Sequence, residues 1–162
     1  MNADTISLRP IGVIHSPFTQ LVGMPIQTAG APREKASLEV FEEFVPGLSD
    51  IQGFDYLILL THLHLVAQEK LQVVPFMDDT PRGVFATRAP ARPNRIGLSI
   101  VRLLSVDGST LHFEGNDMLD GTPVLDVKPY VPQLDVRDTT RIGWFEKRVQ
   151  NVGQTRSDDR MA

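Results

Sequence analysis

The sequence contains no cysteine, which excludes disulfide bonds, thiolate zinc sites, iron–sulfur clusters and a cysteine nucleophile. Its most apolar stretch, within GFDYLILLTHLHLV, is too short to cross a bilayer. The first residues, MNADTISLRP, lack the basic segment and the apolar run of a signal peptide. We therefore expect a cytoplasmic protein with no membrane partner.

The chain has an ordinary size and composition for one soluble domain, with 162 residues, 41% apolar residues and a net charge of −4. Its charge is unevenly spread, because residues 80–106 hold five arginines and neither Asp nor Glu. A positive window in an acidic protein favours an anionic ligand, whereas the net charge argues against unselective coating of nucleic acid. The alternative is an accident of surface charge, with the arginines paired to acids elsewhere in the fold.

Short β-strands separated by turn residues are the main elements that the sequence predicts. The expected strands are residues 8–16, 55–66, 71–76, 83–87, 96–106, 110–115 and 122–131. Residues 36–44 and 136–148 are ambiguous between strand and helix, and Asp107-Gly108 predicts a tight hairpin turn. Twelve glycines and twelve prolines leave little room for long helices.

This pattern predicts an all-β (mainly β) fold, in which a single sheet closes into a β-barrel with short helical segments. No strand–helix–strand unit carries G-x-G-x-x-G, which disfavours a Rossmann domain. The composition changes after Asp135. We therefore expect a barrel domain over residues 1–135 and a partly disordered C-terminal extension over residues 136–162.

The loop GVFATRAPARPNRIG, residues 83–97, is a candidate binding segment. Pro90 and Pro93 fix their own backbone and disfavour helix just before them, so Arg88 and Arg92 are not helical neighbours. A guanidinium binds a carboxylate or phosphate through two parallel hydrogen bonds, and a stiff loop presents it with little loss of freedom. The loop predicts an anion site, unless its arginines pair with acids within the fold.

Acidic and histidine motifs give two further candidates. Asp117 and Asp120 lead into a Gly-Thr-Pro turn, where carboxylates can accept bonds from ribose hydroxyls, stabilise a cation or cap the turn. Such an isolated pair is weak evidence for magnesium. His62 and His64 are expected on one face of a strand, and with Glu69 they resemble the metal site of cupin barrels. No second histidine motif follows, so we expect no metal.

Together these motifs resemble the TsaA/TrmO-like family, the class VIII S-adenosylmethionine-dependent methyltransferases. The family signature is a Gly-x-Phe-small-x-Arg-small-x-x-Arg-Pro-Asn string, which residues 83–94 match without a gap. IGVIHSPF near the start, His64 after the long strand and DMLDGTPVLDVKPYVP follow the family's order, so the likeness covers residues 8–135. It implies a single-sheet β-barrel that binds S-adenosylmethionine, usually as a homodimer with its pockets near the interface.

The resemblance also implies site residues, position by position. Its cofactor contacts fall on Pro25, Ile26, Gln27, His64, Leu65, Arg88, Leu98, Asp117, Met118, Leu119 and Asp120. We assign to the substrate Arg92, Asn94, Arg95 and Lys128. In this family the nitrogen that receives the methyl group is a weak nucleophile, so we expect a side chain that takes up its proton. The sequence does not rank the candidates, which are His64, Asp117 and Tyr130.

The best-known members methylate N6 of threonylcarbamoyladenosine at position 37 of a tRNA, and we expect this activity, with tRNA as partner. Two departures bear on the substrate: Arg95 stands where the family commonly has proline, and only 27 residues follow Asp135, where longer members carry a further domain. The alternatives are a methyltransferase of the same fold acting on a small molecule or another RNA, a non-catalytic RNA-binding barrel, and a cupin-like metal enzyme. Few aromatic residues that could be exposed interleave with the basic residues, which disfavours the RNA-binding barrel.

Overall fold

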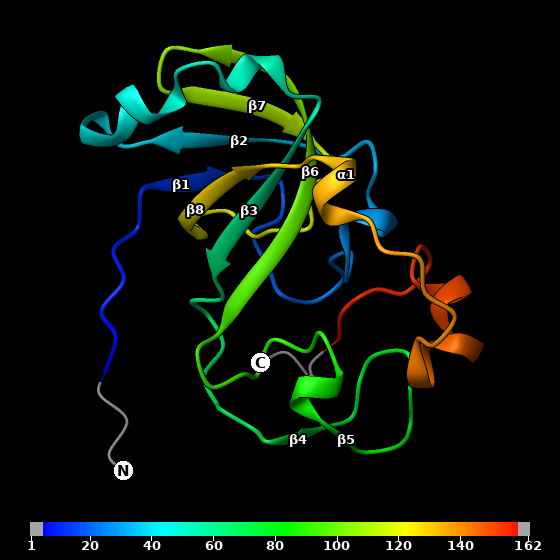
Figure 1. Cartoon of the computed structure of the whole chain (residues 1–162). Helices are drawn as coiled ribbons and strands as arrows, with labels where there is room; N and C mark the ends of the chain where they lie inside the picture. The colour runs from blue at the N-terminus through cyan, green and yellow to red at the C-terminus, as the bar shows by residue number, and fades with distance from the viewer. Residues whose placement is uncertain (1–4, 159–162) are drawn as a thin grey trace.

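Six antiparallel strands close into one barrel in the computed structural model, which describes residues 5–158. The strands are β1 (Gly12–His15), β2 (Lys35–Val40), β3 (Tyr56–His62), β6 (Ile96–Asp107), β7 (Thr110–Glu114) and β8 (Pro123–Pro129). Their order around the barrel is β1-β2-β7-β6-β3-β8, and the pairing of β1 with β8 completes the circle (Figure 1). The predicted all-β barrel is confirmed.

The other elements are short. Strands β4 (Gln72–Val73) and β5 (Arg82–Gly83) pair with each other within residues 63–95, a segment that we call the loop layer and that lies beyond one end of the barrel (Figure 1). A single α-helix in the described part, α1 (Pro132–Asp135), follows β8. The 3-10 helices there are Thr28–Gly30, Glu42–Leu48, Ile51–Gly53, Val84–Ala86, Gly143–Lys147 and Val149–Asn151. No helix within residues 5–158 has the length and apolar character needed to span a membrane.

Alternation along the strands fills the barrel with apolar side chains. On β3, Leu57 and Leu59 are buried while Tyr56 is exposed. Val101 of β6 and Phe113 of β7 belong to the same core cluster. The cluster also contains Ile14, Leu38, Val40, Leu111, Met118 and Val124. Burial of one such side chain contributes roughly 1.5–3 kcal/mol, so this interior supplies the core that a chain of this size needs.

The side chains that point into the barrel become polar near the end of β3. Thr61 of β3, Ser99 of β6 and Thr122 just before β8 are all buried. Gly97 pairs with Thr61, and a Cβ at Gly97 would lie 2.5 Å from the Thr61 hydroxyl oxygen. Glycine therefore allows β3 and β6 to approach closely here. The resulting polar end of the barrel faces the loop layer.

The predicted strands along the second half of the barrel are confirmed. Residues 96–106, 110–115 and 122–131 correspond to β6, β7 and β8. The hairpin between β6 and β7 turns at Gly108, whose φ of 57° suits glycine. The ambiguous residues 36–44 divide between β2 and the 3-10 helix that starts at Glu42.

Three strand predictions that reach into the loop layer need correction. The strand expected over residues 55–66 is confirmed as β3 but is shorter: it ends at His62, which pairs with the first residue of β6, and the Val66 N–H then donates to the Leu63 carbonyl (3.3 Å) in a turn. His62 and His64 therefore do not share a strand face. Residues 84–86 form a 3-10 helix where a strand over 83–87 was expected, and the strand expected over 71–76 is limited to β4.

Residues 143–157, within the expected C-terminal extension, pack against the loops beyond the barrel. The Trp144 indole N–H donates to the Ala86 carbonyl (2.8 Å), and the Ser157 hydroxyl oxygen accepts the Met24 N–H (2.9 Å). Residues 136–148 adopt neither of the two forms expected for them, apart from the short 3-10 helix that begins at Gly143. Residues 159–162 lie outside the described part, so partial disorder of this extension stays a prediction.

Candidate functional site

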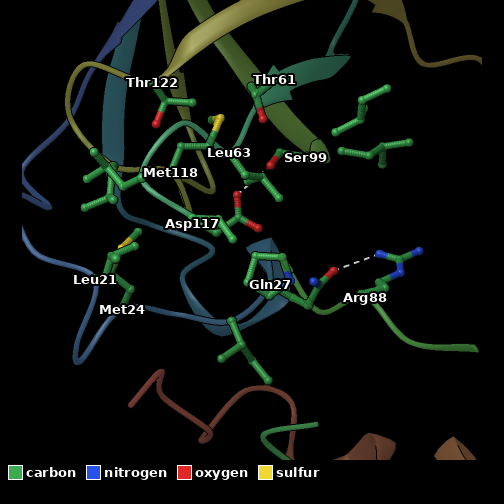
Figure 2. Close-up of a pocket in the computed structure, with 18 of the residues that line it drawn as sticks. Leu21, Met24, Gln27, Thr61, Leu63, Arg88, Ser99, Asp117, Met118 and Thr122 are labelled. Atoms are coloured by element: carbon green, nitrogen blue, oxygen red, sulfur yellow. Dashed lines mark hydrogen bonds between the residues drawn. The ribbon is translucent and has the colours of Figure 1, made fainter. Parts of the chain in front are cut away.

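A cavity of about 320 Å³ lies between the polar end of the barrel and the surrounding loops. Its lining residues come from segments 21–27, 61–66, 87–92, 96–99 and 117–122. Figure 2 shows Leu21 and Met24 on one side, Arg88 on the other and Asp117 between them. The volume falls in the range of small-molecule sites, about 300–1000 Å³. We call this space the first cavity.

Asp117 places a carboxyl group in the first cavity, where the Ser99 hydroxyl donates to its Oδ1 at 2.6 Å (Figure 2). Burial raises the pKa of this carboxyl to about 6, although the Ser99 hydrogen bond, backbone N–H groups and the charge of Arg88 act in the opposite direction. A cationic ligand would offset the cost of burying the ionised form. The position is therefore suited to a positive group.

The turn that carries Asp117 is held by Asn116, which is fully buried. The Asn116 side-chain amide donates to the Ser16 hydroxyl (2.7 Å) and to the Met118 carbonyl (3.2 Å), and its oxygen accepts the Met118 N–H (3.1 Å). The Ser16 hydroxyl also donates to the Met118 carbonyl (2.7 Å). These bonds fix the turn to the end of β1, so Asp117, Met118 and Leu119 enter the cavity wall as one unit.

Arg88 and Gln27 meet at the edge of the first cavity. The Arg88 guanidinium donates to the Gln27 side-chain oxygen at 2.7 Å (Figure 2). A guanidinium carries five N–H donors, so Arg88 can hold Gln27 and also bind an anionic group. With a cation at the edge and an acid inside, the cavity suits a zwitterionic ligand that has apolar parts.

Arg92 also lines the first cavity, but its guanidinium stabilises the loop. One of its nitrogens donates to the carbonyls of Thr87 (2.9 Å), Val84 (3.2 Å) and Ala89 (3.4 Å). These bonds draw the backbone into the 3-10 helix observed where a strand was expected. The stiffness of this loop therefore comes from an arginine as well as from its prolines.

Two other arginines of the positive window are paired with acids. Arg82 contacts the buried carboxylate of Asp78 at 2.9 Å, and Arg102 contacts Glu114 at 2.9 Å. For these two, pairing within the fold is the correct interpretation. The window's contribution to ligand binding rests mainly on Arg88.

The structure brings together most of the predicted cofactor residues. Those that line the first cavity are Pro25, Ile26, Gln27, His64, Leu65, Arg88, Leu98, Asp117, Met118 and Leu119. Asp120 is exposed on the turn outside the lining, where its carboxylate accepts the Ser16 N–H at 3.0 Å. His64 reaches the cavity from a turn after β3, not from the strand itself.

Of the predicted substrate residues, only Arg92 lines the first cavity. Asn94 is exposed, and Lys128 forms an ion pair with Asp126 at 2.8 Å on the outside of β8. Arg95 adopts a φ of 50° in the loop, which is uncommon for a residue with a side chain.

Tyr130 is not brought to the first cavity. Its ring packs edge-on against Tyr56 at the first residue of β3, with ring centroids 6.2 Å apart. The cavity lies at the other end of that strand, beside Thr61.

Several lining residues are absent from the sequence-based set. Thr61, Gly97, Ser99 and Thr122 form the polar end of the barrel, and Leu21, Met24 and Leu63 add apolar wall. The alternation of β6 could have placed Ser99 on the inner face. Nothing in the sequence pattern identified the contact of Ser99 with Asp117. Within residues 5–158, no group of three or more His, Cys, Asp or Glu side chains is arranged to hold a metal ion.

Comparison with known proteins relates this barrel to a family. The family model described as "tRNA-methyltransferase O N-terminal domain" matches residues 13–136. A probable S-adenosyl-L-methionine-binding protein of Pyrococcus abyssi is 50% identical over 155 residues, which are 96% of this chain and 84% of that protein. The mouse tRNA (adenine(37)-N6)-methyltransferase is 34% identical over 143 residues, 83% of this chain and 33% of the mouse protein.

A solved structure shares the fold. The crystal structure of TrmO from Pseudomonas aeruginosa superimposes with a TM-score of 0.73 at 38% identity, covering 87% of this chain and 63% of that one. This chain thus spans less than two thirds of that protein and one third of the mouse enzyme. The family-model match and the archaeal relative together show that the chain belongs to the tRNA-methyltransferase O N-terminal domain family.

Proposed function

We propose that this chain is an S-adenosylmethionine-dependent methyltransferase that acts on tRNA and that the first cavity binds the methyl donor. The observation that carries this proposal is the convergence of segments around Gln27, His64, Arg88, Leu98 and Asp117 on one cavity. The resemblance of the sequence to the TsaA/TrmO-like family implies a cofactor contact in each of these segments. The names of the relatives support the same ligand and the same reaction class.

The residues present fit S-adenosylmethionine. The Asp117 carboxylate stabilises a positive charge inside the cavity, and Arg88 binds a carboxylate at its edge. Leu98, Met118 and the other apolar lining residues exclude water around them. When bound, S-adenosylmethionine supplies an electrophilic methyl group, which passes to the acceptor nitrogen as the carbon–sulfur bond breaks toward sulfur and the nitrogen loses a proton.

We propose N6 of threonylcarbamoyladenosine at position 37 as the acceptor. The name of the mouse relative supports N6 of adenine 37, and the family signature supports the threonylcarbamoyl form of that adenosine. The protein must then align the acceptor and remove a proton. His64 and Asp117 line the cavity and are the proposed proton acceptors, whereas Tyr130 lies at the far end of β3. A tRNA substrate also favours the cytoplasm as the compartment.

A homodimer is part of this proposal. Ile96, Leu98 and Ile100 are exposed on the outer face of β6 at 41%, 48% and 37%, and Leu60 of β3 pairs with Leu98. An apolar sheet face of this kind favours a protein partner, and Leu98 also lines the first cavity. Light scattering should give a dimer for the wild type and for Leu134→Glu on α1, and a monomer for Ile100→Glu; a monomeric wild type would contradict the dimer.

Label transfer tests the reaction. Purified protein is incubated with S-adenosylmethionine tritiated in the methyl group and with either total tRNA or a metabolite extract. We expect label in tRNA, and nuclease digestion should recover it as N6-methylated threonylcarbamoyladenosine. Label confined to metabolites would instead favour a small-molecule methyltransferase of the same fold, and no transfer to either would contradict the proposed activity.

A further inference from the structure

A second cavity, of about 390 Å³, lies beside the first and is not used by the cofactor proposal. Its walls come from residues 70, 72–77 and 88–91 of the loop layer, from Ile26 and Gln27, and from the C-terminal segment. Most of these side chains are apolar, and Trp144 and Phe145 add two aromatic rings. Its volume also falls in the range of small-molecule sites, about 300–1000 Å³.

The two cavities share part of their walls. Ile26, Gln27, Arg88 and Pro90 line both, and the hydrogen bond from Arg88 to Gln27 lies at this boundary. Methyl transfer is an in-line displacement, so the acceptor must approach the donor from a neighbouring space with little distance between them. A second cavity that adjoins the first through a shared wall has this geometry.

The charged side chains that line the second cavity are all positive. Its charged lining residues are Lys70 and Arg88, and no Asp or Glu of the described chain lines it. Aromatic side chains favour planar rings, which stack on them, and the two cations favour an anionic substituent. The combination fits a nucleobase that carries, or lies beside, a negative group.

The aromatic wall is held in place from several sides. The rings of Trp144 and Phe145 stack with centroids 4.0 Å apart, and the indole N–H is bonded to the Ala86 carbonyl. Four residues later, Arg148 contacts the buried carboxylate of Asp78 at 3.1 Å and donates to the Met77 carbonyl (2.8 Å). The C-terminal segment is therefore fixed to the loop layer as a preformed wall.

We propose that the second cavity is the acceptor site, in which the target nucleobase lies against Trp144 and Phe145 with its anionic group at Lys70 and Arg88. This inference rests on the proposed function, because it needs a methyl donor in the first cavity. It gives the C-terminal segment a role in substrate binding that the barrel alone does not provide. The negative group is a carboxylate on the base or a phosphate next to it.

Trp144 is the one tryptophan of the sequence, so its fluorescence reports on this cavity directly. The full chain is first saturated with S-adenosylhomocysteine, so that the adenine of the cofactor contributes a constant background. Threonylcarbamoyladenosine, adenosine and adenosine 5′-phosphate are then titrated separately. We expect threonylcarbamoyladenosine or adenosine 5′-phosphate to quench the emission at a concentration at least tenfold lower than adenosine, and the better of the two identifies the anionic group. Lys70→Gln should remove this advantage.

A matched pair of variants tests the site in the full reaction. Val74 lines the second cavity and is 37% exposed, whereas Leu71 is 65% exposed and lines neither cavity. Val74→Glu should raise the KM for tRNA at least tenfold and leave the Kd for S-adenosylmethionine unchanged. Leu71→Glu, which adds the same charge to the same loop, should change neither.

The outcomes separate this inference from the proposed function. If the wild type binds S-adenosylmethionine and labels tRNA, yet no nucleoside quenches Trp144 and the two glutamate variants behave alike, the acceptor site lies elsewhere and the inference is overturned. If the wild type binds no S-adenosylmethionine in calorimetry, the proposed function itself fails.

Discussion

The carboxyl of Asp117 should make the binding of S-adenosylmethionine depend on pH. Its pKa is raised to about 6 by burial, so the group is largely ionised at pH 8 and largely protonated at pH 5. A positive ligand needs the ionised form, and binding at low pH must therefore release a proton. The affinity should be constant above about pH 7 and fall roughly tenfold for each pH unit below 6, a loss of about 1.4 kcal/mol per unit.

Titration calorimetry between pH 5 and pH 8 measures this dependence. Asp117→Asn keeps an oxygen that accepts the Ser99 hydrogen bond but cannot ionise, so it should bind more weakly at pH 8 and lose the dependence below pH 6. Asp120→Asn, an exposed acid on the same turn that lies outside the lining, should behave like the wild type. The same titration of His64→Gln shows how much of the pH dependence of the affinity comes from the imidazole that lines the same cavity.

Ionisation of the Asp117 carboxyl favours ligand binding but lowers the stability of the free protein. A raised pKa means that the fold disfavours the ionised form, so stability declines as the pH rises from about 4 to about 6. Two pKa units correspond to about 3 kcal/mol, which is the upper limit of what Asp117→Asn should add to the free energy of unfolding at pH 7 without ligand.

A wild-type Kd that is flat from pH 8 to pH 5, or an Asp117→Asn variant with the wild-type pH profile, would refute this reasoning.

Three further predictions concern the fold. Gly12→Ala should destabilise it by roughly 1–3 kcal/mol in urea unfolding, because the added Cβ would overlap the carbonyl oxygen of Glu39 on β2; wild-type stability would contradict the close approach. Phe113→Ala should cost about 3–5 kcal/mol by leaving a void in the barrel core, and a loss below 1 kcal/mol would show that the core collapses around it. For Asp78, burial acts to raise the pKa, but hydrogen bonds, first that from Arg82, outweigh it and lower the pKa to about 2. Its stabilisation is therefore complete above about pH 4 and lost between pH 4 and pH 2, so Asp78→Asn should flatten the acid limb of a Tm-against-pH curve, and an unchanged limb would exclude this role.

The barrel was predictable because its strands follow local rules. β6 alternates along its first half, with Ser99 and Val101 buried and Leu98 and Ile100 exposed, and this pattern is visible in the sequence. The turn at Gly108 follows from glycine chemistry. The gathering of the predicted cofactor residues around one cavity could also be expected, because the family's order of motifs fixes which strand ends they follow.

The errors arise where distant contacts override local preference. The strand before His64 ends early because its partner β6, more than thirty residues away, begins only at Ile96, which pairs with His62. The carbonyls of Val84, Thr87 and Ala89 turn toward Arg92 because its side chain binds them. No pattern within 136–148 indicates that Arg148 reaches Asp78 across seventy residues, so the wall of the second cavity could not be predicted.

The binding of S-adenosylmethionine to two arginine variants tests the central claim most directly. Arg88 lies at the edge of the first cavity and bonds to Gln27, whereas Arg102 belongs to the same positive window but pairs with Glu114 outside the lining. In titration calorimetry, Arg88→Ala should weaken binding roughly tenfold or more, the value of a charged hydrogen bond, and Arg102→Ala should match the wild type. Equal affinities for the wild type and Arg88→Ala would contradict the assignment of this cavity to the methyl donor.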